Sequence, residues 1–324
     1  MIHTFALPMP PPMRSANAYL VEGDPLTLVD TGPKSARGLE ALKAALAAAG
    51  CSLADIDQVV ITHPHLDHFG LAKQIVEESG ARVLVHAEGV RCLVDYEGEL
   101  VRLADLSASH LRESGAPDGA WGILRLRTSM YRCFAESVPA DMVEPLQDGQ
   151  CLSLGEEAWQ VVPTPGHCIG HIGLYQADSG RLISGDCLLP GYSFIPVPYP
   201  VAVSAPGPGQ VGAFADSLSR LGELDVHEVL PGHGPAHYEA GALLARDRAN
   251  LADARERLWA ALAEGGQTAY ELWTKCAGPF RAYDVLTGIE VVIGYLDAMR
   301  HEGKVSISEK EGLTTYSRTA AARS

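Results

Sequence analysis

The feature that most constrains the fold is a group of metal-binding residue types that directly follows a short apolar segment. Residues 56–61 read as a buried strand, and residues 62–68 (THPHLDH) come immediately after it. Burying three imidazoles and a carboxylate this close together would be costly without a bound ion. Nitrogen and hard oxygen donors together suit zinc, with iron or manganese as alternatives. The chain must therefore fold so that the end of one strand presents a metal-binding loop.

Three further residues of the same kinds follow strand-like segments. His167, Asp186 and His233 each lie beside a glycine, just after a short apolar run. A single histidine in such a place is more often an ordinary hydrogen-bonded polar residue. Four loops at the ends of strands can nevertheless converge at one edge of a sheet, so we predict that these residues join the loop at 62–68.

The surrounding pattern indicates a mixed α/β (α+β) domain, because short apolar segments alternate with amphipathic ones. Residues 89–142 have helical periodicity and are expected to form a helical insertion. Residues 190–209 contain six prolines and are expected to form an extended loop. With the insertion, this loop could wall an apolar pocket, although ordinary helix packing explains the apolar insertion residues equally well. The expected strands are 18–22, 26–30, 56–62, 82–86, 151–162, 172–176, 181–184 and 226–230, and the expected helices are 35–50, 71–79 and 241–264.

The composition changes after Gly265-Gly266. The pattern predicts a short helix over 268–275, a longer helix over 285–300 and a hairpin over 304–317. Two helices followed by a two-stranded wing is the order of a winged helix. We therefore predict a catalytic domain over residues 1–265 and a small winged-helix-like domain over residues 268–324.

The net charge of the chain indicates which kinds of partner it can bind. Lys and Arg number 25 against 40 Asp and Glu, a net charge of −15, while residues 268–324 carry seven of each and are neutral. Nonspecific nucleic-acid binding needs positive charge, so a nucleic-acid partner is disfavoured. Seven scattered cysteines without a Cys-x-x-Cys pair suggest reduced thiols. Without a signal peptide or an apolar run of about 18 residues, we expect a cytoplasmic protein with no membrane partner.

Taken in order, Asp30 after its strand, the loop at 62–68, His167, Asp186 and His233 resemble the motifs of the metallo-β-lactamase-fold hydrolase superfamily. The resemblance spans residues 15–237 and implies a four-layer αββα sandwich with two divalent metal ions. The C-terminal segment resembles the winged-helix-like unit of the subgroup that includes lactamase-β-like protein 2. The resemblance assigns His63, His65 and His167 to the first ion, Asp67, His68 and His233 to the second, Asp186 as the bridge, and Asp30 as a support for the metal loop.

Two ions that share a water can generate hydroxide at neutral pH. The first hypothesis is therefore a hydrolase in which a metal-bridging hydroxide attacks a small ester, thioester or lactone. Asp67 would orient the hydroxide and carry a proton, and His171 would orient a ligand or a loop. Tyr192 and Phe194 are candidate substrate contacts. The alternative is a nuclease that cleaves RNA phosphodiesters with the help of the winged unit, and that unit could instead mediate a homodimer.

Overall fold

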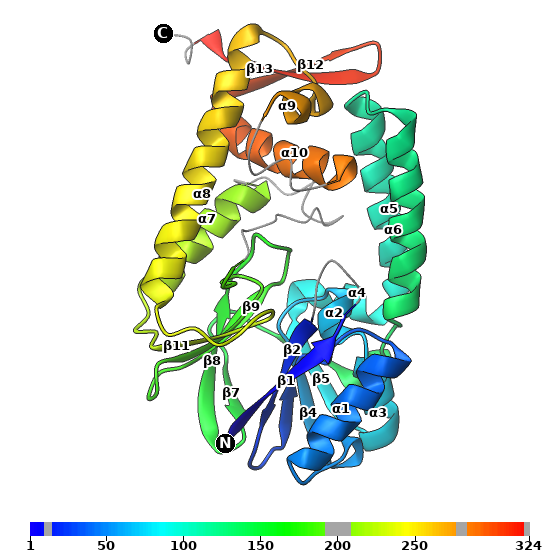
Figure 1. The fold of residues 1–324 in the computed structure, drawn as a ribbon, viewed down its shortest axis with the longest axis vertical. Coiled ribbons are helices and arrows are strands. Elements are labelled where there is room, and N and C mark those ends of the chain that lie inside the picture. The colour runs from blue at the N-terminus through cyan, green and yellow to red at the C-terminus, as the bar shows by residue number, and fades with distance from the viewer. Residues whose placement is uncertain (10–14, 192–208, 277–283, 321–324) are drawn as a thin grey trace.

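The computed structural model describes residues 1–9, 15–191, 209–276 and 284–320 (Figure 1). Its strands are β1 (Ile2–Pro8), β2 (Ser15–Val21), β3 (Thr27–Val29), β4 (Gln58–Ile61), β5 (Arg82–His86), β6 (Val143–Leu146), β7 (Cys151–Leu154), β8 (Glu157–Pro163), β9 (Ile172–Gln176), β10 (Arg181–Gly185), β11 (Glu228–Pro231), β12 (Val305–Lys310) and β13 (Leu313–Arg318). Its α-helices are α1 (Ala36–Ala48), α2 (Leu66–Phe69), α3 (Ala72–Ser79), α4 (Val90–Val94), α5 (Tyr96–Glu113), α6 (Asp118–Phe134), α7 (Gly209–Leu221), α8 (Ala240–Ala261), α9 (Ala269–Lys275) and α10 (Val285–His301).

Two sheets form the centre of the larger part of the molecule. The first has the strand order β1-β2-β3-β4-β5-β6, and the second has the order β11-β10-β9-β8-β7. In the first sheet β3, β4, β5 and β6 run parallel to one another. In the second sheet β8, β10 and β11 share one direction, because β9 is antiparallel to both β8 and β10. The carboxyl ends of these groups of strands carry the loops described below.

The strands alternate between two apolar cores, as the period of two in a strand requires. In β4, Val59 and Ile61 pack with α1 and α3, whereas Val60 faces the other sheet. In β10, Leu182 packs with α7 and α8, whereas Ile183 lies between the sheets. The layers are therefore helix, sheet, sheet and helix, which confirms the αββα sandwich.

The predicted strands and helices are found, and the main differences concern the strands. The predicted strand at 151–162 is a hairpin, β7 and β8, that turns at Gly155 with a φ of 57°. Strands β1 and β6 were not predicted. Both lie at the edges of the first sheet and contain a proline, Pro8 in β1 and Pro145 in β6. An edge strand tolerates proline because one side of its backbone needs no partner in the sheet.

The C-terminal elements pack on the helical insertion. Residues 285–301 form α10, which is buried around most of its circumference, and β12 and β13 form a hairpin that turns at Glu311-Gly312. One hydrophobic cluster joins α10 and α9 to α5, α6 and α8 (Figure 1). The two-helix and hairpin order is as predicted, and the segment shares this core with the insertion. A domain boundary at residues 265–268 stays a prediction.

A buried polar network lies where the insertion meets α10. Arg127 of α6 donates to both carboxylate oxygens of Glu290, over 3.0 Å to Oε2 and 3.2 Å to Oε1. Ser107 of α5 donates to Glu290 Oε1 over 2.6 Å and accepts from Arg127 over 2.6 Å. The side chain of Glu290 is only 1% exposed, so its charge depends on these two partners.

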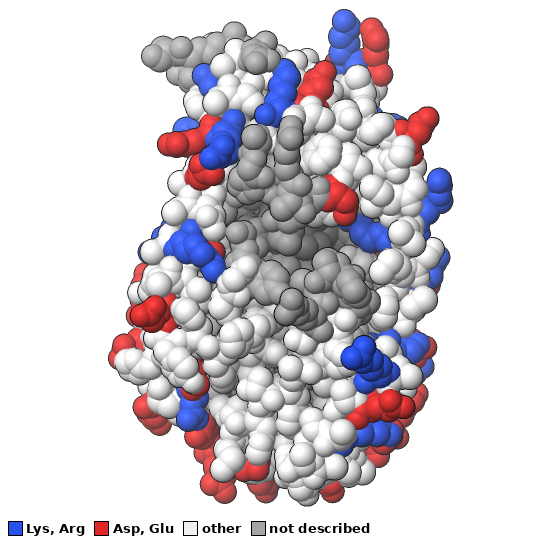
Figure 2. Space-filling view, viewed as in Figure 1, with Lys and Arg blue, Asp and Glu red and all other residues white. Residues whose placement is uncertain are grey.

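Charged residues of both signs are mixed over the surface in Figure 2, where Lys and Arg lie among Asp and Glu along both margins. This face therefore has no continuous basic patch among its described residues. None of the seven cysteines, which all lie in the described ranges, forms a disulfide. In the part of the chain that the structure describes, no helix has the length and apolar character needed to span a membrane.

Candidate metal centre

The predicted ligands meet at one edge of the sandwich, because each follows the carboxyl end of a strand. Residues 62–68 follow β4 of the first sheet, and the segment with His167 follows β8 of the second. Asp186 follows β10, and His233 follows β11. Since β8, β10 and β11 run in one direction, their carboxyl ends lie together. The two sheets thus bring all seven residues to one place.

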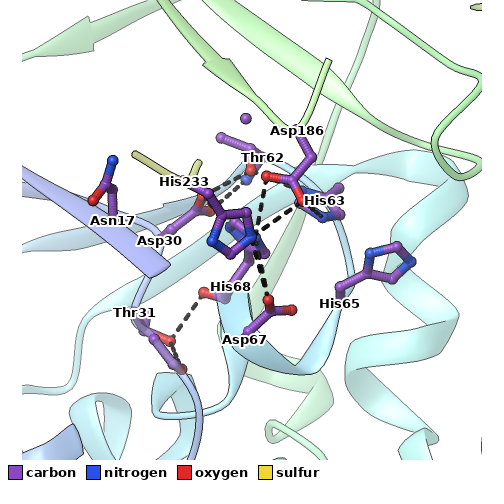
Figure 3. A network of polar contacts seen from close by, with 12 residues as sticks. Asn17, Asp30, Thr31, Thr62, His63, His65, Asp67, His68, Asp186 and His233 are labelled. Carbon is purple, nitrogen blue, oxygen red and sulfur yellow. Dashed lines mark hydrogen bonds and ion pairs between the residues drawn. The ribbon is translucent and has the colours of Figure 1, made fainter. Parts of the chain in front are cut away.

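The carboxylate of Asp186 lies at the centre of this group (Figure 3). Its Oδ2 is 3.3 Å from His233 Nε2, 3.6 Å from His167 Nε2 and 3.9 Å from His63 Nε2. Its Oδ1 is 3.5 Å from His68 Nε2. Four imidazoles thus face one carboxylate, which is the arrangement expected of a group that bridges two ions.

Two sets of donors flank this carboxylate. Potential ligand atoms of His63, His65 and His167 lie within 4.8 Å of one another, and so do those of Asp67, His68 and His233. In the first set, His65 Nδ1 and His167 Nε2 are 2.9 Å apart. In the second, Asp67 Oδ2 is 3.4 Å from His233 Nε2 and 3.9 Å from His68 Nε2.

Asp30 orients two of the imidazoles. It lies at the end of β3 with a φ of 59°, and its carboxylate accepts hydrogen bonds from the backbone N–H and hydroxyl of Thr62, both over 2.8 Å. It also accepts from His68 Nδ1 over 2.8 Å. Because the Thr62 hydroxyl donates to Asp30, it is free to accept from His63 Nδ1, 3.1 Å away. Both rings then present Nε2 to the site, the tautomer that a metal ion requires.

His171 holds the backbone of Asp186. The Asp186 N–H donates to His171 Nε2 over 3.0 Å, so this nitrogen carries no proton and Nδ1 donates to the Thr164 hydroxyl, 2.8 Å away. Burial, with a smaller contribution from His167, lowers the pKa of His171 well below its usual value. A Cβ on Gly185 would lie 2.8 Å from His171 Nε2, so this close approach needs glycine. His171 is engaged with the backbone rather than directed at an ion.

Several buried atoms in the site have no hydrogen-bond partner among the described residues. They are His63 Nε2, His65 Nε2, His68 Nε2 and Asp186 Oδ1. Buried polar atoms are rarely left unpaired in folded proteins. Nitrogen and oxygen atoms that converge in this way fit divalent metal ions of the zinc type, with five imidazoles and two carboxylates available in the two sets and Asp186.

Burial and neighbouring charges set the pKa values, and so the protonation states, of the candidate ligands. Burial lowers the pKa of His65 to about 3, with a further contribution from His167, so its ring is neutral at pH 7. Burial raises the pKa of Asp67, but His68 and His233 outweigh it and bring the pKa to about 2. Burial lowers the pKa of His233, but Asp186 and Asp67 outweigh it and hold the pKa at about 10. The carboxylates are therefore charged, and His233 holds a proton until an ion replaces it.

Metal binding should consequently release protons. Burial lowers the pKa of His68, but Asp186 and Asp30 outweigh it and raise the pKa well above its usual value, and the pKa of His233 is about 10, so in the metal-free protein His233 is protonated at pH 7 and the proton on His68 is favoured. An ion needs the Nε2 lone pair and must therefore displace the proton. At pH values below the pKa of the ring, the metal affinity should rise about tenfold per pH unit for each proton displaced. We expect one to two protons released per chain at pH 7, measured by calorimetry in buffers of different ionisation enthalpy. A binding enthalpy that does not depend on the buffer would contradict this.

The sequence reasoning missed two groups that support the site. Asn17, a buried polar residue in the otherwise apolar β2, bonds to the loop that carries His233. Thr31 accepts from the Leu71 N–H and donates to the His68 carbonyl, which fixes both ends of the turn after Asp67. A polar residue inside an apolar strand was the available signal for Asn17. The candidate substrate contacts, Tyr192 and Phe194, lie outside the described residues.

Fold and site together define a class of protein. The sequence model of the metallo-β-lactamase superfamily matches residues 11–233, which include every predicted ligand and all strands of the two sheets except β1. The chain belongs to this superfamily and is one of its metal-dependent hydrolases.

Particular relatives sharpen this placement. The probable metallo-hydrolase YqjP of Bacillus subtilis strain 168 is 30% identical over 318 residues, which cover 97% of this chain and 96% of that protein. The acyl-coenzyme A thioesterase MBLAC2 of Gallus gallus is 30% identical over 233 residues, which cover 67% of this chain and 72% of that protein. The crystal structure of the metallo-β-lactamase family protein TTHA1429 from Thermus thermophilus has a TM-score of 0.81 and 25% identity and covers 98% of both chains.

Proposed function

We propose that this chain is a binuclear hydrolase that cleaves a small ester, thioester or lactone. The observation that carries the proposal is the place of Asp186, whose carboxylate lies within 4 Å of imidazoles from both sets of donors. A carboxylate with two oxygens can hold one ion on each side. We assign the first ion to His63, His65 and His167, the second to Asp67, His68 and His233, and the bridge to Asp186.

The donor set favours zinc, with iron or manganese as alternatives. Two such ions would supply a hydroxide nucleophile at neutral pH and would polarise the acyl carbonyl under attack. The chain's own contribution is to place and orient groups. Asp67 is charged at neutral pH and partly open to solvent, so its carboxylate can accept a hydrogen bond from the nucleophile and then hold a proton.

Two observations support a small acyl substrate over a nucleic acid. Lys and Arg are interspersed with Asp and Glu on the face in Figure 2, which suits a long phosphate backbone poorly. The relative named as an acyl-coenzyme A thioesterase favours a thioester among the three acyl substrates. In the same proposal Tyr192 and Phe194 contact the substrate, the protein is cytoplasmic, and the winged unit is a candidate for homodimer formation.

The test combines metal analysis with a substrate panel. The purified protein, loaded with Zn²⁺ and passed through a desalting column, should hold close to two ions per chain. Acyl-coenzyme A thioesters, short esters and lactones should be cleaved with thioesters fastest, and EDTA should abolish the activity. One ion or none per chain would overturn the binuclear assignment. Cleavage of phosphodiesters or single-stranded RNA without cleavage of any acyl substrate would overturn the substrate class.

A further inference from the structure

Asn17 is a buried polar residue beside the candidate metal centre, and it is not one of the predicted ligands. It lies near the start of β2, in the first sheet, and is 2% exposed. Strand β2 is antiparallel to β3, so the start of β2 lies at the same edge as the end of β3, where Asp30 begins the metal loops. The His233 loop comes from the second sheet. Asn17 therefore lies where the two sheets meet beside the candidate metal centre (Figure 3).

Three hydrogen bonds join Asn17 to this loop. Its side-chain Nδ2 donates to the carbonyls of Pro231 over 2.8 Å and of Gly234 over 2.7 Å. Its backbone N–H donates to the carbonyl of Gly232 over 2.7 Å. Both side-chain partners are carbonyl oxygens, which only accept, so the amino group of the carboxamide must face them. An aspartate has no such donors. An apolar residue would remove both side-chain bonds and would leave the Pro231 carbonyl with its bond from the Tyr19 hydroxyl.

The bonds lie on both sides of His233. Residues 231 and 232 precede the histidine and residue 234 follows it, so Asn17 fixes the loop at both ends of the ligand. Tyr19, two residues along the same strand, donates a further bond to Pro231 over 2.6 Å. The carbonyl of Ser15 accepts from His233 Nδ1 over 2.7 Å, which directs Nε2 toward Asp67 and Asp186. One strand thus controls both the backbone and the ring of His233.

The loop has little room to move toward the site. A Cβ on Gly232 would lie 2.1 Å from Asp186 Oδ1 and 2.9 Å from His68 Cε1. The backbone of the loop therefore packs directly on two of the other predicted ligands. Three bonds from Asn17 hold this backbone in place. Because His233 lies in this loop, a shift of the loop would change the distances from His233 to Asp67 and Asp186.

From these contacts we infer that Asn17 is a positioning residue for the second metal ion. It acts through the 231–234 loop, which it holds so that His233 Nε2 faces Asp67 and Asp186, and it does not touch the ion. The side-chain bonds of Asn17 go to this loop and to Tyr19 rather than to the donors of the first ion. This inference rests on the proposed two-ion site and adds a residue that acts selectively on one half of it.

The test measures ion affinity rather than turnover. Metal-free wild-type protein and Asn17→Ala are titrated with Co²⁺, and binding is followed by the visible absorption bands and by calorimetry. We expect the first ion to bind with unchanged affinity and the second about 10- to 100-fold more weakly, the usual effect of removing a group that orients a ligand. Asn17→Asp, which keeps the size and loses the donors, should behave in the same way.

The controls separate this inference from the proposed function. Asn250→Ala makes the same change on α8, which provides none of the predicted ligands, and should leave both affinities unchanged. Wild-type protein that binds one ion would overturn the two-ion site itself. Two ions with unchanged second affinity in Asn17→Ala, or equal weakening of both, would overturn only the positioning role. If Asn17→Ala does not fold, Tyr19→Phe removes one bond to Pro231 and must weaken the second ion alone.

Discussion

Replacing Asp186 by asparagine should reduce acyl hydrolysis by about 10³-fold or more, which corresponds to about 4 kcal/mol of transition-state stabilisation. The side chain keeps its shape but loses its charge and one of two oxygens, while four imidazoles still face it. A neutral amide is a poor bridge between two cations. We therefore expect the metal content after desalting to fall from two ions per chain to one or fewer.

A matched control exists on the same hairpin. Asp178 lies in the exposed turn between β9 and β10, at the opposite end of β10 from Asp186. Asp178→Asn makes the identical chemical change and should retain full activity and two ions. Metal content by mass spectrometry and initial rates on the best substrate of the panel give the two readouts. Asp186→Asn with two ions and near wild-type rates would refute the bridging assignment.

Replacing Arg127 by methionine should destabilise the protein by about 3–5 kcal/mol, the usual cost of leaving a buried charge without its partner. The Glu290 side chain is 1% exposed, and Arg127 and Ser107 supply its hydrogen bonds. Burial lowers the pKa of Arg127, but Glu290 outweighs this effect and raises it, so the charged pair is favoured. Urea unfolding followed by tryptophan fluorescence measures the loss, since Trp121, Trp259 and Trp273 pack against the same cluster.

The double variant Arg127→Met with Glu290→Leu provides the control. Removing both charges replaces an ion pair with apolar groups, so most of the lost free energy of unfolding should return. The difference between the single and double variants isolates the unpaired carboxylate. A loss below about 1 kcal/mol in Arg127→Met would contradict the prediction, because it would show that solvent or another partner compensates Glu290 when α6 is altered.

Much of the sandwich could be predicted because its central strands are apolar on both faces. Residues 59–61 and 83–85 are continuous apolar runs, which is typical of parallel strands covered on both sides. Strands β1 and β6 could not be identified in this way, since they are edge strands with prolines and mixed burial. The core that the insertion shares with α10 could not be predicted from the sequence either, because contacts between residues about 180 positions apart leave no local sequence pattern.

The candidate site was easier to predict from the sequence than the fold around it. Metal-binding residues are few and chemically distinct, and strand ends place them at one edge, so their order along the chain predicted the group that the structure brings together. The supporting residues carry a weaker signal. Asn17 and Thr62 are ordinary polar residues whose roles depend on hydrogen bonds between distant segments, and only the three-dimensional structure reveals these bonds.

The division of the candidate ligands between the two sheets has a consequence for biosynthesis. His63, His65, Asp67 and His68 come from the first sheet, whereas His167, Asp186 and His233 come from the second. A growing chain that has formed only its first sheet holds neither complete set, and the last donor arrives with residue 233. Under the proposed assignment, the first ion can bind only after His167 has been added to the chain and the second only after His233. Each ion would then link the two sheets.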